Sequence, residues 1–113
     1  PIAKMAELLA LYEKSAQAAG VDCAFIGHAG NGILRCYSAD AAKTAALADL
    51  IGSFTGEAAK REGNLMVEAA PPTLKEKVSV WGLPGSDVVA IRRLKEKIDP
   101  AGVLAPGRFV GGI

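Results

Sequence analysis

The dipeptide Asn31–Gly32, which lies between two short apolar stretches, constrains the fold of this chain more than any other feature. Asn and Gly both tolerate positive φ, so the pair is a strong signal for a two-residue turn between antiparallel strands. The sequence therefore predicts a β-hairpin with strands at 22–28 and 33–38. Counting outward from this turn predicts that His28 faces Arg35 across the hairpin.

Amphipathic patterns flank the predicted hairpin on both sides. Apolar residues recur at helical spacing over residues 2–19, and Gly20 suits the C-terminal cap of that helix. A second helix is predicted from Asp40 to about Glu62, ended by Gly63. Its buried stripe is expected to comprise Leu47, Leu50, Ile51, Phe54 and Ala58. Within it, Gly52 and Gly56 weaken the helix by about 1 kcal/mol each relative to Ala, or else allow close packing on the sheet.

The second half of the chain gives weaker signals. Residues 64–70 alternate like a third strand, which Pro71–Pro72 stop, and residues 73–81 are ambiguous, with a short edge strand at 78–81 as one interpretation. Pro84-Gly85-Ser86 is expected to open a third helix that Ser86 caps. The apolar face of that helix is predicted to be Val88, Ile91, Leu94 and Ile98. The prolines and glycines of residues 98–113 exclude a helix there.

The order helix, strand, strand, helix, strand, helix predicts an α+β fold over a single domain, residues 1–113. It matches a ferredoxin-like antiparallel sheet with helices on one face, in which the first strand of the βαββαβ unit is missing. That strand belongs in the middle of the sheet. It lies upstream of Pro1, or a second copy of the chain fills the gap, or the sheet rearranges. We therefore expect a fragment of a longer protein that self-associates, and the absence of an initiator Met at Pro1 supports a processed or truncated product.

Composition excludes several classes of function. Half of the residues are hydrophobic and the net charge is +1, so charge gives no support for binding nucleic acid or a membrane surface. No apolar run approaches the ~18 residues of a membrane span, and no signal peptide pattern is present. The basic residues of the third helix are interpreted as a solvated face: Arg92, Arg93, Lys95 and Lys97.

The two cysteines, Cys23 and Cys36, do not have the spacing of metal ligands. In the predicted hairpin they lie several residues apart along the strands, which is too far for a disulfide. We interpret them as buried thiols in a reducing compartment.

One face of the predicted hairpin carries unusual polar residues. Alternation places His28, Arg35 and Tyr37 on one face with Ile26 and Ile33, opposite an apolar face of Phe25, Leu34 and Cys36. On the third strand, Glu68 is expected to join the polar face. Arg35 could hold a small carboxylate in a bidentate fork, and His28 could act as a base or as a hydrogen-bond partner. The alternative is a surface ion pair between Arg35 and Glu68, with His28 only flanking a turn.

The glycine-rich segment 27–32 also has the appearance of a phosphate-binding loop. It joins two strands and leads into no helix, so the dinucleotide-binding fingerprint does not apply. A hairpin turn explains the glycines better.

This turn resembles the C-terminal domain of FAD-linked oxidases. In many members that act on 2-hydroxyacids the turn reads His-x-Gly-Asp-Gly-Asn-Leu-His, and its two histidines bind a divalent metal together with a later Glu. His28, Gly30, Gly32 and Leu34 match this pattern, whereas Asn31, Ile33 and Arg35 depart from it. Glu68 is placed like the later Glu but is followed by Ala69-Ala70 instead of His-Gly. Because Arg35 is a cation and would repel a metal, we expect no metal site.

The end of the chain resembles the same family. Asp99-Pro100 to Pro106-Gly107-Arg108 is similar to the family's closing Asp-Pro and Pro-Gly-Arg/Lys motif. Relatives carry an Asn before that Pro-Gly, close to the flavin, where this chain has Ala105. The segments 80–82 and 107–113 are most similar to the FAD-binding E-type subunits of bacterial glycolate oxidases.

The resemblance implies a cofactor and a set of site residues. FAD would be bound in the intact subunit, mainly by a domain that is not in this chain, and none is expected in the isolated chain. The chain would form part of the cap over the flavin. His28, Arg35, Tyr37 and Glu68 would face the substrate or the flavin. Asn31, Gly107 and Arg108 would lie near the cofactor, and no catalytic residue can be assigned.

The resemblance also implies a reaction and partners. The complex would oxidise glycolate, a small 2-hydroxyacid, to glyoxylate, together with a catalytic D subunit and an iron–sulfur F subunit. It would be cytoplasmic, or peripheral to the inner membrane through the complex, and the isolated chain would be inactive. Two alternatives stay open: a standalone ferredoxin-like module that binds a small carboxylate, and the cap of a metal-dependent hydroxyacid dehydrogenase.

Overall fold

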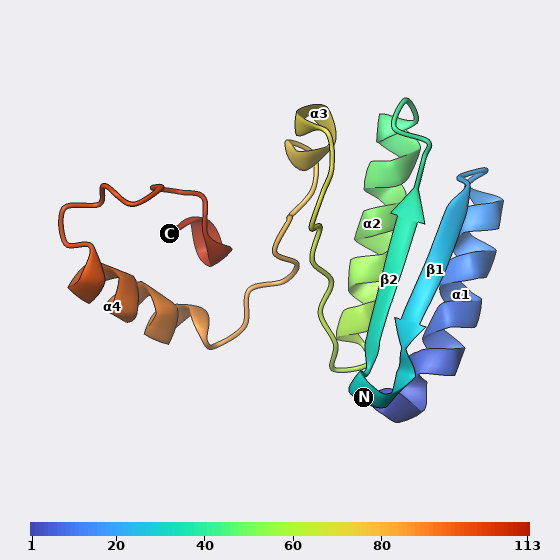
Figure 1. Cartoon of the computed structure of the whole chain (residues 1–113), viewed down its shortest axis with the longest axis horizontal. Helices are drawn as coiled ribbons and strands as arrows, with labels where there is room; N and C mark the ends of the chain where they lie inside the picture. Colours follow the sequence, from blue (N-terminus) through green and yellow to red (C-terminus); the bar gives the residue numbers. More distant parts are fainter.

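The computed structural model describes all 113 residues. Its N-terminal half is an antiparallel hairpin of two strands, β1 (Cys23–His28) and β2 (Ile33–Ser38), covered on one face by two helices. These helices are α1 (Met5–Ala18), which follows a 3-10 turn at Ile2–Lys4, and α2 (Thr44–Ala59). The α+β class and the arrangement of a partial ferredoxin-like domain are confirmed (Figure 1).

The C-terminal half is more loosely built. It contains the short helix α3 (Pro72–Lys75), the helix α4 (Val88–Ile98) and a 3-10 turn at Val110–Gly112. Figure 1 shows α4 and the segment after it standing apart from the hairpin, on the far side of the chain that carries α3. None of the helices is both long and apolar enough to cross a lipid bilayer.

The core lies between the hairpin and its two helices. Seven buried residues form it: Tyr12, Ala16, Val21, Leu47, Leu50, Phe54 and Leu74. The rings of Tyr12 and Phe54 stack with centroids 3.8 Å apart, and the Tyr12 hydroxyl donates a 2.7 Å hydrogen bond to the Phe54 carbonyl. The stripe predicted for the second helix is therefore confirmed, with Ile51 at its half-buried edge.

The register of the hairpin differs from the prediction. Residues 29–31 form a 3-10 turn and Gly32 alone takes positive φ (69°), so the loop has four residues instead of two. His28 consequently pairs with Ile33, and Arg35 pairs with Ile26. The shift is two residues, so every side chain stays on its predicted face.

The second helix begins later than predicted. Asp40 does not start it; instead, its carboxylate accepts hydrogen bonds from the Asp22 amide (2.8 Å) and the Lys43 ammonium (3.0 Å). These bonds lower the pKa of Asp40, that from Asp22 most strongly, and they tie the end of β2 to the start of β1. The two glycines of the helix, Gly52 and Gly56, have open space where a Cβ would lie. Close packing of the helix on the sheet therefore does not explain these glycines.

The predicted third strand does not form. Residues 64–70 contain no strand, and neither does the possible edge strand at 78–81. The only backbone hydrogen bond between these two segments runs from the Val67 amide to the Val80 carbonyl, at 2.8 Å. Alternating apolar residues can form one buried face of a strand, but a strand also needs a second strand to hydrogen-bond to. No backbone hydrogen bond joins residues 64–70 to β2.

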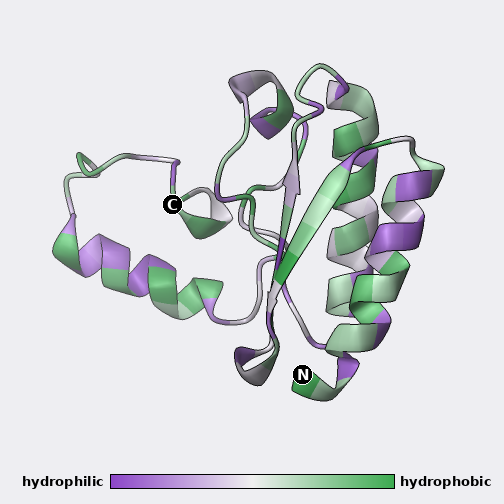
Figure 2. Cartoon of the chain, turned by 45° about the vertical axis from the view of Figure 1, so that its right-hand side comes forward, coloured by the Kyte–Doolittle hydropathy of each residue, from purple (hydrophilic) through white to green (hydrophobic).

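Helix α4 forms where expected but is capped and covered differently. Asp87, not Ser86, occupies its N-cap position, and no side chain caps it. Its predicted apolar face is not buried: Leu94 is 59% exposed and Ile98 is 65% exposed. Figure 2 shows polar and apolar residues alternating around this isolated helix. Of its basic residues, Lys95 is half-buried and pairs with the buried Asp99.

The cysteines are free, and they are less buried than predicted. Cys23 is half-buried and Cys36 is exposed as a residue. The shifted register places them two residues apart on the same face, nearer than the predicted register would. Desolvation of the thiol, with a smaller contribution from a hydrogen bond to Cys23, raises the pKa of Cys36 to about 12. The Cys36 thiol is therefore protonated at neutral pH.

Candidate functional site

The face of the hairpin that points away from α1 and α2 is the candidate site. Apolar side chains are left uncovered there: Ile26 is 54% exposed, Ile33 45% and Tyr37 49%. Period-two alternation places them on this face, because Phe25 and Leu34 on the other face pack against the core. An uncovered apolar surface of this kind is suited to contact with another surface or with a flat ligand.

Arg35 and Glu68 meet at this face. The Arg35 Nη2 lies 3.3 Å from the Glu68 Oε1, with 49% and 62% of the two side chains exposed. Such exposed pairs contribute about 0–1 kcal/mol, so this contact does not hold the fold together. No other side-chain hydrogen bond or ion pair involves Arg35, which leaves most of its guanidinium donors for a ligand. The geometry matches the surface ion pair that the sequence left open, and the ligand-binding role of Arg35 stays a prediction.

The other two residues of the predicted set lie on the same face without joining this pair. His28 is at the end of β1, opposite Ile33 and not opposite Arg35, because of the longer loop. It makes no side-chain hydrogen bond. Tyr37 lies opposite Ala24. The four residues therefore share a surface, but the only ion pair or hydrogen bond among their side chains is that between Arg35 and Glu68.

The residues expected near the cofactor lie in two separate places. Asn31 ends the 3-10 turn between β1 and β2. Gly107 and Arg108 lie in the C-terminal tail, where the Arg108 carbonyl accepts a 3.3 Å hydrogen bond from the indole of Trp81. No hydrogen bond or ion pair joins the tail to the sheet face, and Figure 1 shows the two on opposite sides of the α3 segment.

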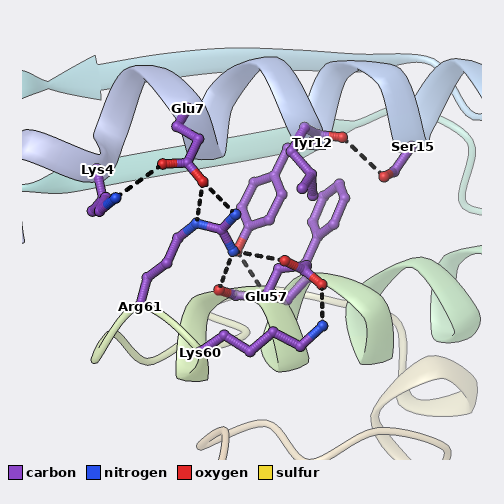
Figure 3. Close-up of polar contacts among 9 residues, drawn as sticks. Lys4, Glu7, Tyr12, Ser15, Glu57, Lys60 and Arg61 are labelled. Carbon is purple, nitrogen blue, oxygen red and sulfur yellow. Dashed lines mark hydrogen bonds and ion pairs between the residues drawn. The ribbon is translucent and has the colours of Figure 1, made fainter.

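A charged network that the sequence did not reveal links α1 to the end of α2 (Figure 3). Arg61 donates to Glu7 at 2.7 Å and to Glu57 at 2.6 Å. Each of these hydrogen bonds lowers the pKa of its carboxyl; for Glu57 the bond from Lys60 has the larger effect. The pairing of Glu7 with Arg61 spans 54 positions, so no local pattern could have shown it.

Two open cavities lie away from the sheet face. One, of about 470 Å³, is lined by this charged network and has no hydrophobic lining residue. The other, of about 440 Å³, lies between α4 and the tail and is lined by Arg92, Lys95, Glu96 and Gly107 among others. The structure brings together no group of three His, Cys, Asp or Glu side chains that could hold a metal ion.

Comparison with known proteins decides the family. A model of the C-terminal domain of FAD-linked oxidases matches residues 1–109. The chain belongs to this family. The family is one of flavin-dependent oxidoreductases, and its members use FAD as the cofactor of the intact enzyme. No curated protein sequence and no solved structure matches the chain significantly.

The residues present fit a surface that covers FAD but not a pocket that encloses it. A flavin ring needs a mostly apolar cavity, but the first of the two cavities above has no hydrophobic lining residue and the second has only one. The sheet face, in contrast, offers an exposed apolar strip of Ile26, Ile33 and Tyr37 beside a guanidinium. When bound, FAD supplies the oxidising power, by accepting two electrons from the substrate.

Proposed function

We propose that this chain is the C-terminal cap portion of the FAD-binding E-type subunit of a bacterial glycolate oxidase. The complex would oxidise glycolate to glyoxylate with a catalytic D subunit and an iron–sulfur F subunit, in the cytoplasm or peripheral to the inner membrane. The family match gives the class of enzyme. The observation that carries the finer proposal is Arg35, which stands where metal-dependent relatives have a histidine and which contacts Glu68.

The contact between Arg35 and Glu68 disfavours a metal-dependent cap. A metal at that position would lie beside the guanidinium, and the repulsion between the two cations would weaken binding. The carboxylate that would coordinate the metal is instead turned toward Arg35. A fixed positive charge can take over one task of the metal, which is to hold the carboxylate of a small 2-hydroxyacid.

The test uses the intact subunit within its complex. Arg35→Ala and His28→Ala are compared with Lys14→Ala, which changes an exposed residue of α1 that forms no ion pair. We expect the two site variants to reduce flavin content, assembly or glycolate turnover by about tenfold or more. If all three properties equal those of the Lys14→Ala complex, the sheet face does not serve the flavin site.

A second function is favoured by one observation: Arg35 has free donors on an exposed face. A standalone module could use them to bind a small carboxylate. Its signature would be thermal stabilisation of the isolated chain by glycolate or a similar acid, lost in Arg35→Ala. Stabilisation of the isolated chain, together with an intact protein that takes up no flavin, would favour this module over the cap.

A further inference from the structure

The C-terminal tail folds around one buried carboxylate. Asp99 follows α4, and its side chain is only 2% exposed. One carboxylate oxygen accepts the Val103 amide at 2.9 Å and the other accepts the Leu104 amide at 2.8 Å. The Lys95 ammonium contacts the same carboxylate and also donates to the Leu104 carbonyl at 2.6 Å. Residues 99–104 therefore take their shape from Asp99.

A second anchor lies only four residues further along the chain. The Trp81 indole donates to the Arg108 carbonyl, and its ring makes an edge contact with Phe109, with centroids 5.3 Å apart. The segment between the anchors is short, and its backbone has unusual dihedral angles. Pro106 has a fixed φ, while Ala105 and Gly107 both have positive φ, 45° and 73°. Because only three residues separate them, the position of Leu104 limits where Arg108 can lie.

We propose that Asp99 is a positioning residue, which sets the place of Gly107 and Arg108 by holding the turn that precedes them. The proposal rests on the proposed function only where it treats these two residues as lying near the cofactor. Contact with Lys95, and next the Leu104 amide, lowers the pKa of Asp99 to about 2. The carboxylate is therefore ionised at neutral pH and accepts its hydrogen bonds as an anion, which makes them stronger than neutral ones.

The experiment compares Asp99→Asn with Glu96→Gln in the 113-residue chain. Asn has the same shape but replaces one acceptor oxygen with a donor that faces an amide. Glu96 is an exposed residue of α4 without an ion pair, so Glu96→Gln is the matched control. The readouts are amide exchange at Val103 and Leu104, and acrylamide quenching of Trp81, the only tryptophan.

We expect Asp99→Asn to speed exchange at both amides about tenfold or more and to increase quenching of Trp81. Glu96→Gln should change neither. If exchange rises while quenching stays at the wild-type value, the two anchors are not coupled and the proposal is wrong. If neither changes, Asp99 does not hold the turn. Protection of the β1 and β2 amides shows that the rest of the chain stays folded.

If Asp99→Asn abolishes that protection, Lys95→Gln gives the same readouts with the carboxylate intact. It should increase quenching of Trp81, and wild-type quenching would contradict the proposal. Neither readout depends on flavin. A tail that responds as expected while the intact protein takes up no FAD would leave the positioning role and overturn the cofactor role. If the intact protein binds FAD but Asp99→Asn changes neither readout, the cofactor role stands and the positioning role of Asp99 is wrong.

Discussion

Tyr12 and Tyr37 show how differently one residue type can contribute to this chain. The Tyr12 hydroxyl is buried and bonded to the Phe54 carbonyl, and burial raises the pKa of Tyr12 to about 12. Tyr12→Phe should lower the free energy of unfolding by about 1 kcal/mol, because the hydrogen bond from the Tyr12 hydroxyl to the Phe54 carbonyl is lost. Tyr37 is exposed and makes no such bond, so Tyr37→Phe should leave stability unchanged. Urea denaturation of both variants checks this, and equal losses would contradict it.

Gly82 is a second residue whose effect can be predicted in sign. It has φ of 74°, and a Cβ there would clash with the Leu65 carbonyl oxygen. Gly82→Ala should therefore destabilise the chain by about 2 kcal/mol or more. Gly52→Ala and Gly56→Ala are the controls. Both glycines lie in α2 with open space around them, so each change should stabilise by about 1 kcal/mol. Urea unfolding followed by Trp81 fluorescence measures the stability of all three variants. A higher stability for Gly82→Ala would show that the loop around Gly82 has room for a Cβ, contrary to the structure.

At the scale of elements, the sequence predicted what depends on local pattern. The two long helices, both strands of the hairpin and the faces of its side chains follow from periodicity. The register did not, because Asn31–Gly32 fits a two-residue turn as well as the end of a four-residue loop. Alternation over 64–70 indicated a strand, but a strand also needs a neighbouring edge. Glu68 nonetheless reaches Arg35, because side chains can meet across a distance that backbones do not close.

The charged network between α1 and α2 predicts an acid-sensitive contact. Hydrogen bonds from Arg61 and Lys4 lower the pKa of Glu7 below its usual value, and hydrogen bonds from Lys60 and Arg61 do the same for Glu57. A lowered folded-state pKa stabilises the fold above the unfolded value, and that stability is lost as pH falls through the folded value. Thermal stability should therefore decline as the pH drops below about 4.5, and the decline should be smaller in Arg61→Gln than in the wild type.

Melting temperatures at pH 7, 5 and 3.5 would test this contact between the two helices. Lys14→Gln, which changes an exposed α1 residue that forms no ion pair, is the control and should follow the wild type. An Arg61→Gln chain with the same acid dependence as the wild type would show that other carboxyl groups, such as Asp40, account for it.

At the scale of the whole molecule, the residues that we propose for function lie on surfaces that the chain leaves uncovered. The sheet face presents Arg35 beside apolar side chains, α4 exposes Leu94 and Ile98, and the tail carries Gly107 and Arg108. Composition and periodicity could identify these residues but could not place the sheet face and the tail relative to each other.

The central claim is that these residues cover a flavin in a glycolate-oxidising complex. The most direct test is the visible absorption spectrum of the intact gene product, purified with its partner subunits, before and after glycolate is added without oxygen. The account predicts a flavin spectrum that glycolate bleaches. A product that shows no flavin absorption even after reconstitution with FAD would contradict it, and a flavin that other 2-hydroxyacids reduce but glycolate does not would contradict the proposed substrate.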